Sequence, residues 1–362
     1  MRLLFITQKL HGQDAFGTLW IREFIRQGFE VEVICLEGSK EQFEFPVHSL
    51  GKEHGASRLR SVFTFKKLII TLKYDRVFIH MAPIWYLLGW KWWLFQRIPT
   101  YLWYTHYKMQ WGVRFFGWFG TRFFCATPQS LPQFNESRKK TVVGHGIDLS
   151  VWVKRRNLAQ NPYRLLVVHR LSRSKRLELS IQALLHLDSR YTIDVYGIEA
   201  EKDYVAELHG LVDRLGLRSR VTFHGTIPMT RLPEIYSRHR LILNMASETI
   251  DKTMLEAMTC GCYPVTTKAN AAAIASTPAP SFAKASEGKP SPSTGLCGAA
   301  GGGECSSLLA PQEDSSQAIA AFIRQYADRL PLDADQMYRI VEERHSLTGL
   351  MKKMGGFIRS GA

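Results

Sequence analysis

The hydrophobic positions of this chain alternate between short apolar runs and repeats of helical spacing, with glycines between them. In the amino-terminal part this pattern predicts strands at 3–7 and 29–36, with an amphipathic helix at 18–27 between them. Further apolar runs predict strands at 75–80 and 101–106. Strand–helix alternation of this kind is typical of a doubly wound α/β domain with a parallel sheet.

The same alternation resumes after a polar stretch at about 150–162, which we interpret as a linker. It predicts strands at 163–169, 193–197, 221–225 and 241–245 and from 263, and helices at 203–215, 232–237, 252–259, 315–326 and 334–345. A chain of 362 residues is too long for one hydrophobic core. We therefore expect two domains, at 1–152 and 163–335.

From 269 to about 310 the pattern stops, because the segment is rich in Ala, Ser, Pro and Gly and has few large apolar side chains. Such a segment cannot offset the entropy lost on ordering, so it is expected to be a mobile insertion. The insertion either loops out without effect or impairs a site beside it.

Composition bounds the classes of protein that the chain can belong to. No run of about 18 uncharged apolar residues is present and no secretory signal opens the chain, so we expect a cytoplasmic protein. The six cysteines lack zinc spacing and are interpreted as reduced thiols. Asp333 and Asp335 are interpreted as the cap of a helix rather than as metal ligands, and no metal site is expected.

The segment 85–124 holds 17 of the 42 aromatic residues, including seven of the nine tryptophans, with five Lys/Arg and no acid. Indole rings favour the level of lipid headgroups, and cations favour anionic lipid. The alternative is that the rings fill a core, which we expect for Trp103, Phe123 and Phe124. We judge the set too dense to be buried, with Trp92-Trp93 beside Lys91 difficult to hide, and predict contact with an anionic membrane surface.

The formal net charge of +15 suits anionic membranes, phosphorylated substrates or nucleic acid. No helix-turn-helix, zinc finger or RNA-binding sheet motif is present, so nucleic acid is not an expected partner.

Two carboxylates stand eight residues apart in the strand–loop–helix–strand unit at 241–267. Glu248 lies in the predicted loop and Glu256 in the helix. Loops at the carboxyl ends of strands bind ligands in open α/β sheets, and the helix start attracts phosphate. The two acids can therefore hydrogen-bond different hydroxyls of one ligand. The alternative is a solvated loop acid and a surface ion pair.

The residues around Glu248 and Glu256 favour the ligand-binding interpretation. Ser247-Glu248, Leu255-Glu256-Ala257-Met258, Gly261 and Pro264-Val265 resemble the nucleotide-sugar site of retaining GT-B glycosyltransferases of family 4, also called group 1. The resemblance implies that Glu256 holds the ribose hydroxyls of a nucleotide and that Glu248 contacts the transferred sugar. It also implies phosphate contacts by backbone N–H groups near Thr253.

A second match lies at the start of the carboxyl-terminal domain. Arg170 and Lys175 stand five apart at a predicted strand-to-helix turn, and two cations there suit a pyrophosphate. They resemble the family motif G-R-x4-K, with His169 where glycine is usual. Such cations stabilise the charge that develops on a departing phosphate.

In the amino-terminal domain the resemblance is weaker. His106 corresponds to a family histidine beside the reacting sugar; the alternative is a structural histidine held by hydrogen bonds. The first loop, with Gly12 and Gly17, corresponds to one that approaches the donor phosphates and the acceptor; an ordinary strand-to-helix turn is the alternative. In this fold a terminal helix commonly crosses back to the first domain, and 336–362 is the candidate here.

We therefore expect a GT-B fold of two Rossmann-like domains facing across a cleft. The expected activity is retaining, metal-independent transfer of a sugar from a UDP-sugar or GDP-sugar to a hydroxyl of a lipid-linked or cell-envelope glycan, with no cofactor and with the enzyme peripheral on the inner face of the cell membrane. The alternatives are a non-catalytic nucleotide-binding homologue and a basic, aromatic membrane-surface adaptor.

Overall fold

A computed structural model describes residues 1–10, 12, 16–39, 41–107, 109–247, 251–276, 308–326 and 329–361. The chain divides into two compact units. Unit 1 comprises Met1–Gly146 and Leu347–Ala362, and unit 2 comprises Ile147–Ser346. The chain passes from one unit to the other at Gly146 and again at Ser346, so the last helix belongs to unit 1.

Unit 1 is built on a parallel sheet in the order β3-β2-β1-β4-β5-β6-β7. Its strands are β1 (Arg2–Lys9), β2 (Glu30–Glu37), β3 (Val47–Ser49), β4 (Arg76–His80), β5 (Thr100–Trp103), β6 (Arg122–Cys125) and β7 (Lys140–Val142). Its helices are α1 (Phe16–Arg26), α2 (Arg58–Thr71), α3 (Pro83–Phe95), α4 (Trp111–Phe119) and α13 (Leu347–Ser360). Buried apolar runs such as that of β1 are typical of central parallel strands, which are covered on both faces.

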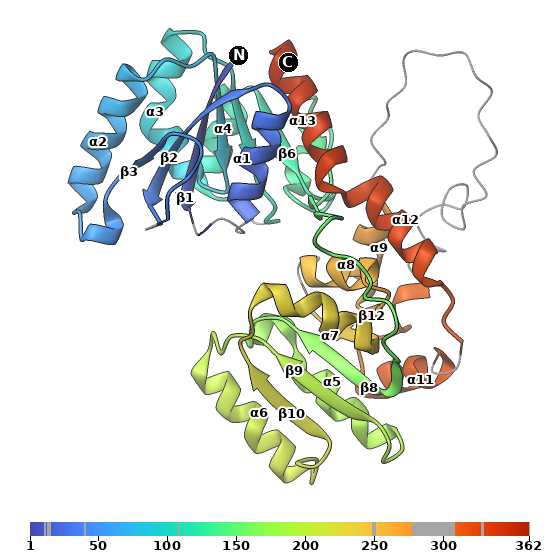
Figure 1. The fold of residues 1–362 in the computed structure, drawn as a ribbon. Helices are drawn as coiled ribbons and strands as arrows, with labels where there is room; N and C mark the ends of the chain where they lie inside the picture. The colour runs from blue at the N-terminus through green and yellow to red at the C-terminus, as the bar shows by residue number, and fades with distance from the viewer. Residues whose placement is uncertain are drawn as a thin grey trace, which may run out of the picture. The chain divides into compact units, whose positions relative to one another are not determined.

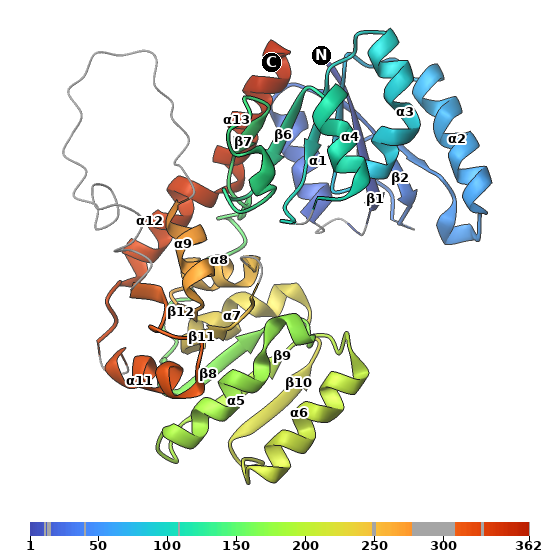
Figure 2. The ribbon, with the colours of Figure 1, turned by 180° about the vertical axis from the view of Figure 1, so that it is seen from behind.

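The helices of unit 1 form one layer on each face of the sheet. Helices α1 and α13 pack on one face, where Trp20 and Met354 share a core with Phe5 and Phe78 of the sheet (Figure 1). Helices α2, α3 and α4 form the opposite layer, seen from behind in Figure 2. The hydrophobic pattern did not single out α2, which carries exposed as well as buried apolar side chains.

The aromatic segment 85–124 is divided between core and surface. The prediction that the whole set is too dense to be buried is confirmed by Phe95, Trp111 and Trp118, which are 83%, 75% and 55% exposed. Trp85, Tyr86, Trp93 and Phe116 nevertheless fill the space between α3, α4 and the sheet, so the prediction that Trp93 is difficult to hide was wrong. Trp93 is 1% exposed and its Nε1–H donates to Tyr74 over 2.9 Å. Its ring lies against Gly89, one turn earlier on α3, where a Cβ would collide with it. Trp103, Phe123 and Phe124 are buried as predicted.

Unit 2 contains a parallel sheet in the order β10-β9-β8-β11-β12. The strands are β8 (Asn161–Val168), β9 (Thr192–Tyr196), β10 (Val221–Gly225), β11 (His239–Asn244) and β12 (Tyr263–Thr266). The helices are α5 (Leu177–Ala183), α6 (Lys202–Arg214), α7 (Leu232–Arg238), α8 (Lys252–Thr259), α9 (Lys268–Ser276), α11 (Ser316–Tyr326) and α12 (Ala334–His345). Helix α5 packs beside α6 and α11, whereas α8 packs beside α7 and α12.

Two helices of unit 2 have defined ends, and the second confirms the predicted cap at Asp333. Gly261 ends α8 with a φ of 77°, and the N–H groups of Gly261 and Cys262 bond the carbonyls of Met258 and Ala257 in a Schellman arrangement. Asp333 caps α12, where it accepts from the N–H of Gln336.

The prediction that 269–310 is a mobile insertion was wrong for its first residues. Residues Lys268–Ser276 form α9, in which Asn270, Ala271 and Ile274 are buried. Alanine is the strongest helix former, and Ile274 supplies the apolar anchor that the compositional argument overlooked. Residues 277–307 lie outside the described residues.

Candidate functional site

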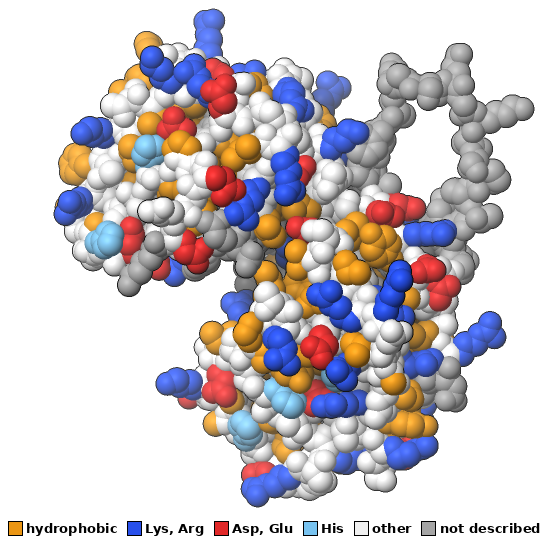
Figure 3. Space-filling model, viewed as in Figure 1, with side chains coloured by type: hydrophobic (Ala, Val, Ile, Leu, Met, Phe, Trp, Pro, Cys, Tyr) orange, Lys and Arg blue, Asp and Glu red, His pale blue; other side chains and the backbone are white. Residues whose placement is uncertain are grey.

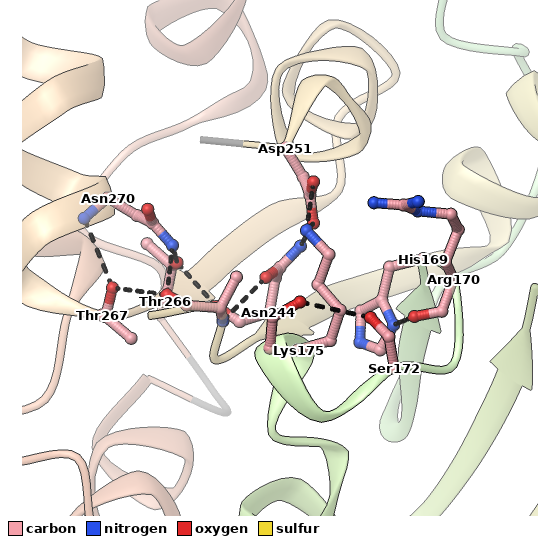
Figure 4. A network of polar contacts seen from close by, with 11 residues as sticks. His169, Arg170, Ser172, Lys175, Asn244, Asp251, Thr266, Thr267 and Asn270 are labelled. Carbon is pink, nitrogen blue, oxygen red and sulfur yellow. Dashed lines mark hydrogen bonds and ion pairs between the residues drawn. The ribbon is translucent and has the colours of Figure 1, made fainter. Parts of the chain in front are cut away.

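The candidate site of unit 2 lies at the carboxyl edge of its sheet, where β8, β9 and β11 end. The loop after β8 carries Arg170 and Lys175, and α8 begins at Lys252 after β11 (Figure 4). Parallel strands present their carboxyl ends at one edge, so these segments meet although some 80 positions separate them in the sequence.

Lys175 is the buried cation of this site. Its Nζ lies 2.6 and 2.7 Å from the two carboxylate oxygens of Asp251, and its side chain is 9% exposed. Asn244, at the end of β11, donates from Nδ2 to Asp251 over 2.7 Å. The carboxylate therefore takes three charge-assisted or polar contacts, which hold Lys175 in place and neutralise its charge.

Arg170 differs from Lys175 in having no ion pair among the described residues. Its side chain is exposed, and Figure 4 shows it extending toward the same side as Lys175. Because no carboxylate of the described residues is paired with the guanidinium of Arg170, this group can bind a diphosphate directly.

His169, which stands where the family motif has glycine, is buried and points into the protein. Its Nδ1 lies 3.0 Å from the carbonyl oxygen of Arg170. Burial lowers the pKa of His169 to about 4, so the imidazole is neutral at pH 7. Gly197, with a φ of 154°, lies against the His169 carbonyl so closely that a Cβ would overlap its oxygen. The loop after β8 is thus supported by β9.

The first turn of α8 supplies two further groups. No side chain caps this turn, and the Oγ1 of Thr253 is buried without a hydrogen-bond partner among the described residues. Free donors at a helix start favour an anion. The hydroxyl of Thr253 is therefore available to a phosphate.

Glu256 lies one turn further along α8 and is 9% exposed. Burial raises its pKa to about 7, an effect that Lys252 opposes and Asp251 reinforces. Burial also lowers the pKa of Lys252 to about 8. A carboxylate poised near pH 7 on this helix can accept hydrogen bonds from the hydroxyls of a ligand.

A second set of polar side chains fixes the segment before α8. Thr266 donates to the carbonyl of Asn244 over 2.7 Å, and Asn270 of α9 donates to the carbonyl of Ala246 over 3.0 Å. The N–H of Ser247 donates to the carbonyl of Ser174, which ties the loop after β11 to the loop after β8.

Sequence reasoning missed Asn244, Thr266 and Asn270. The available signal was a polar residue at the end of each apolar strand, as in LILN before Met245. Sequence reasoning gave Asp251 no role either, because its contact with Lys175 depends on tertiary structure. Glu248 lies outside the described residues.

The two predicted site residues of unit 1 lie at the carboxyl edge of its own sheet. Gly12 follows β1, and its carbonyl accepts from the hydroxyl of Thr18 over 2.9 Å. His106 follows β5, is exposed and has its ring 5.4 Å from that of Tyr104. A Cβ on Gly12 would meet only the carboxylate of Glu41, the end of a flexible side chain.

A model of a known protein family matches the segment that contains the candidate site of unit 2. Residues 150–275 match the family model described as Glycosyl transferases group 1. A search of curated protein sequences gave no match.

The fold of the whole chain matches solved structures. It is similar to HepE from Anabaena in complex with UDP and glucose, with a TM-score of 0.71, 19% identity and 99% of both chains covered. It is also similar to sucrose-phosphate synthase from Thermosynechococcus elongatus, with a TM-score of 0.72, 15% identity and 99% and 98% of the two chains covered. The lipopolysaccharide outer core galactosyltransferase WaaB gives a TM-score of 0.66, 14% identity and full coverage of both chains. The predicted fold class is therefore confirmed: the chain has two Rossmann-like α/β domains of the GT-B fold, and its second unit matches the group 1 glycosyltransferases over residues 150–275.

Proposed function

We propose that this protein is a retaining glycosyltransferase that moves a sugar from a nucleoside-diphosphate sugar to a hydroxyl of a lipid-linked or cell-envelope glycan. The observation that carries the proposal is the grouping of Arg170 and Lys175 with the start of α8, which carries Thr253 and Glu256, within the segment that matches group 1 glycosyltransferases. UDP is the first nucleotide to test, because HepE, whose fold is similar, was solved with UDP-glucose; GDP is the second.

In this proposal each residue has a separate task. Arg170, Lys175 and the N–H groups near Thr253 bind the diphosphate, and Glu256 accepts hydrogen bonds from the ribose. Glu248 contacts the transferred sugar, Gly12 lets the first loop approach the substrates, and His106 lies beside the reacting carbon. The cations neutralise the leaving group, so the proposed reaction needs no metal.

The chemical step exchanges one bond at the anomeric carbon for another. The bond from this carbon to the diphosphate oxygen breaks, and a bond to the acceptor oxygen forms on the same face of the sugar. The acceptor proton passes to the departing phosphate oxygen, so no further base is required. Positive charge at Arg170 and Lys175 contributes more to the transition state than to the ground state.

Calorimetric titration with UDP and with GDP tests the donor site. We expect one nucleotide to bind, with affinity about 10- to 100-fold lower in Lys175→Ala and in Glu256→Gln, since each loses a hydrogen bond to a charged group. Lys202→Ala, an exposed lysine at the start of α6, is the matched control and should bind normally. Failure of both nucleotides to bind, or normal binding by both variants, would overturn the assignment.

A second candidate is a nucleotide-binding protein without turnover, and the Asp251 carboxylate on Lys175 favours it. Release of UDP from UDP-sugars in the presence of glycan acceptors separates the two. Turnover supports the enzyme, whereas tight binding with no release of UDP supports the second candidate. A membrane-surface adaptor, the third alternative, predicts no nucleotide affinity.

A further inference from the structure

Large apolar side chains are exposed on the outer surface of α2 and at the carboxyl-terminal end of α3, although the sequence pattern did not predict this for α2. Leu59, Phe63 and Ile70 are 73%, 72% and 56% exposed. They lie four and seven residues apart, which places them in one stripe along the helix, while Phe65 and Ile69 pack inward. Leu94 and Phe95 of α3 are 52% and 83% exposed. We call these five side chains and the lysines among them the α2–α3 face.

A groove of about 670 Å³ runs between the two helices of this face. Apolar side chains line most of it, including Ile70, Leu88, Trp92 and Phe95. Its volume falls within the range of small-molecule pockets, about 300–1,000 Å³. An apolar groove of this size at the surface is suited to a hydrocarbon chain.

Cations surround the groove, and they are not neutralised. Lys66 and Lys91 line it, and Lys67 stands beside Lys66 on α2. None of these three forms an ion pair with a carboxylate among the described residues. Between residues 54 and 135 the chain has eleven Lys/Arg and one acid, Asp75. Figure 3 shows hydrophobic and Lys/Arg side chains together along the edge of unit 1 where α2 lies.

From this combination we infer that the α2–α3 face docks on an anionic lipid bilayer and that the groove receives an acyl chain of a bilayer phospholipid. Exposed apolar stripes bounded by lysines bind interfaces through buried apolar area and through attraction to anionic headgroups. Another protein would need carboxylates for these lysines, whereas anionic lipid supplies the charge and the hydrocarbon together. The inference assigns a docking site to the membrane partner of the proposed function. It rests on that function only where it concerns the lipid-linked acceptor.

This mode of contact is peripheral. Among the described residues, no helix is both long enough and apolar enough to cross a bilayer. The face therefore lies at the headgroup level, with Leu59, Phe63 and Ile70 directed into the interface and Lys66 and Lys67 at the phosphates.

Co-sedimentation with vesicles tests the docking face. Vesicles of phosphatidylcholine with phosphatidylglycerol should bind the intact protein, and vesicles of phosphatidylcholine alone should bind it at least about tenfold more weakly. Leu59→Ser/Phe63→Ser and Lys66→Glu/Lys67→Glu should each lower the apparent affinity for the anionic vesicles by about tenfold or more. The matched control Leu185→Ser/Val153→Ser changes two exposed apolar residues of unit 2 and should bind normally.

Brominated phosphatidylglycerol tests the groove. It should quench part of the tryptophan fluorescence. Trp92→Phe, which removes one of the two tryptophans that line the groove, should reduce that quenching, whereas Trp152→Phe in unit 2 should not. Equal binding to both vesicle types, normal binding by both face variants, or quenching unchanged in Trp92→Phe would overturn the inference. Light scattering that shows a dimer abolished by Leu59→Ser/Phe63→Ser would identify a second copy as the occupant and would also overturn it.

The same variants separate this inference from the proposed function. UDP titration of Leu59→Ser/Phe63→Ser should match that of the unaltered protein, because the face is far from the donor residues in sequence and belongs to another unit. Absent nucleotide binding with intact vesicle binding would reject the donor site alone. Intact nucleotide binding with no vesicle binding would reject the docking face alone.

Discussion

Asp251 is the residue whose role the sequence predicted least and the structure defines most clearly. Both of its carboxylate oxygens contact the Nζ of Lys175, over 2.6 and 2.7 Å. An incoming diphosphate must therefore compete with a carboxylate for the same ammonium. The carboxylate also repels the phosphates directly, and the partly buried site screens this repulsion only in part.

Replacing Asp251 by Asn removes that competition and keeps the shape of the side chain. We expect the affinity for UDP to rise about fivefold, which corresponds to about 1 kcal/mol. Calorimetry measures it, with Asp203→Asn, an exposed acid on α6, as the control. A weaker affinity in Asp251→Asn would mean that the carboxylate positions Lys175 for binding rather than opposing it.

Glu256 gives the site a pH dependence of known sign. Its pKa is raised by burial from 4.5 to about 7, so between these values the native carboxyl keeps a proton that the unfolded chain has lost. The stability due to Glu256 is present below about pH 4.5 and is lost as pH rises to about 7.

Glu256→Gln removes this titration. The free energy of unfolding of the variant, relative to the unaltered protein, should rise by about 1–3 kcal/mol between pH 4.5 and 7. Urea unfolding across that range measures the difference, so that other titrating groups, such as His169, cancel. A difference that does not change with pH would contradict the raised pKa.

At the scale of elements, β9 supports the loop that carries the two cations. The N–H of His169 donates to the carbonyl of Tyr196 over 3.2 Å, and Gly197 lies directly against the His169 carbonyl. This contact needs a residue without a Cβ and with a φ of 154°. The glycine at the end of IDVYG was predicted as a strand end, but its contact with the loop was not.

Gly197→Ala should therefore displace the loop after β8. We expect a loss of about 2–4 kcal/mol in the free energy of unfolding, together with reduced UDP affinity. Gly210→Ala is the control, because Gly210 lies within α6 and a Cβ there meets only the flexible end of Arg214. Unfolding in urea and calorimetry measure the two effects. An unchanged free energy of unfolding in Gly197→Ala would show that the loop moves aside without loss of stability.

The sheet of unit 2 also contains a polar cluster around a buried carboxylate. Asp194 of β9 is 4% exposed and contacts Arg164, His224 and His239. Burial opposes its ionisation, but bonds from His239, Arg164 and His224 outweigh that effect and hold the pKa of the carboxyl well below its usual range. Such a cluster joins β8, β9, β10 and β11 through one side chain.

At the scale of the whole molecule, the first and last segments of the sequence both belong to unit 1. Helix α13 packs on the sheet beside α1, and its Leu350, Met351, Met354 and Ile358 are at most 1% exposed. Arg76 of β4 donates to the carbonyl of Ile358 over 3.0 Å. The last sixteen residues thus complete the core of the first unit.

Met354→Ala should destabilise unit 1 by about 3 kcal/mol, since it opens a cavity in a fully buried core. Gly356→Ala, two residues later on the exposed side of α13, should instead stabilise the protein by about 0.5–1 kcal/mol, because alanine favours helix and a Cβ there contacts nothing. Thermal unfolding monitored by tryptophan fluorescence reports on unit 1, which contains eight of the nine tryptophans. Equal effects of the two variants would contradict the packing of α13.

The sequence by itself determined the alternation of strands and helices, the α/β class and most element positions, because period-2 and helical repeats are local properties of the chain. Apolar strands such as β8, β9 and β11 were predicted to within a few residues. It also indicated Arg170, Lys175, Thr253 and Glu256 as candidate site residues, because motif spacing can be recognised in the sequence alone.

Only the tertiary structure decided which of these side chains meet and which rings are covered. The Lys175–Asp251 contact spans 76 positions, and no periodicity encodes it. The aromatic segment 85–124 has one composition throughout, yet Trp93 is buried and Trp111 is 75% exposed, because the face of each helix that packs on the sheet depends on its neighbours. The exposed stripe of α2 arises in the same way, since burial is a property of three-dimensional packing and not of residue type.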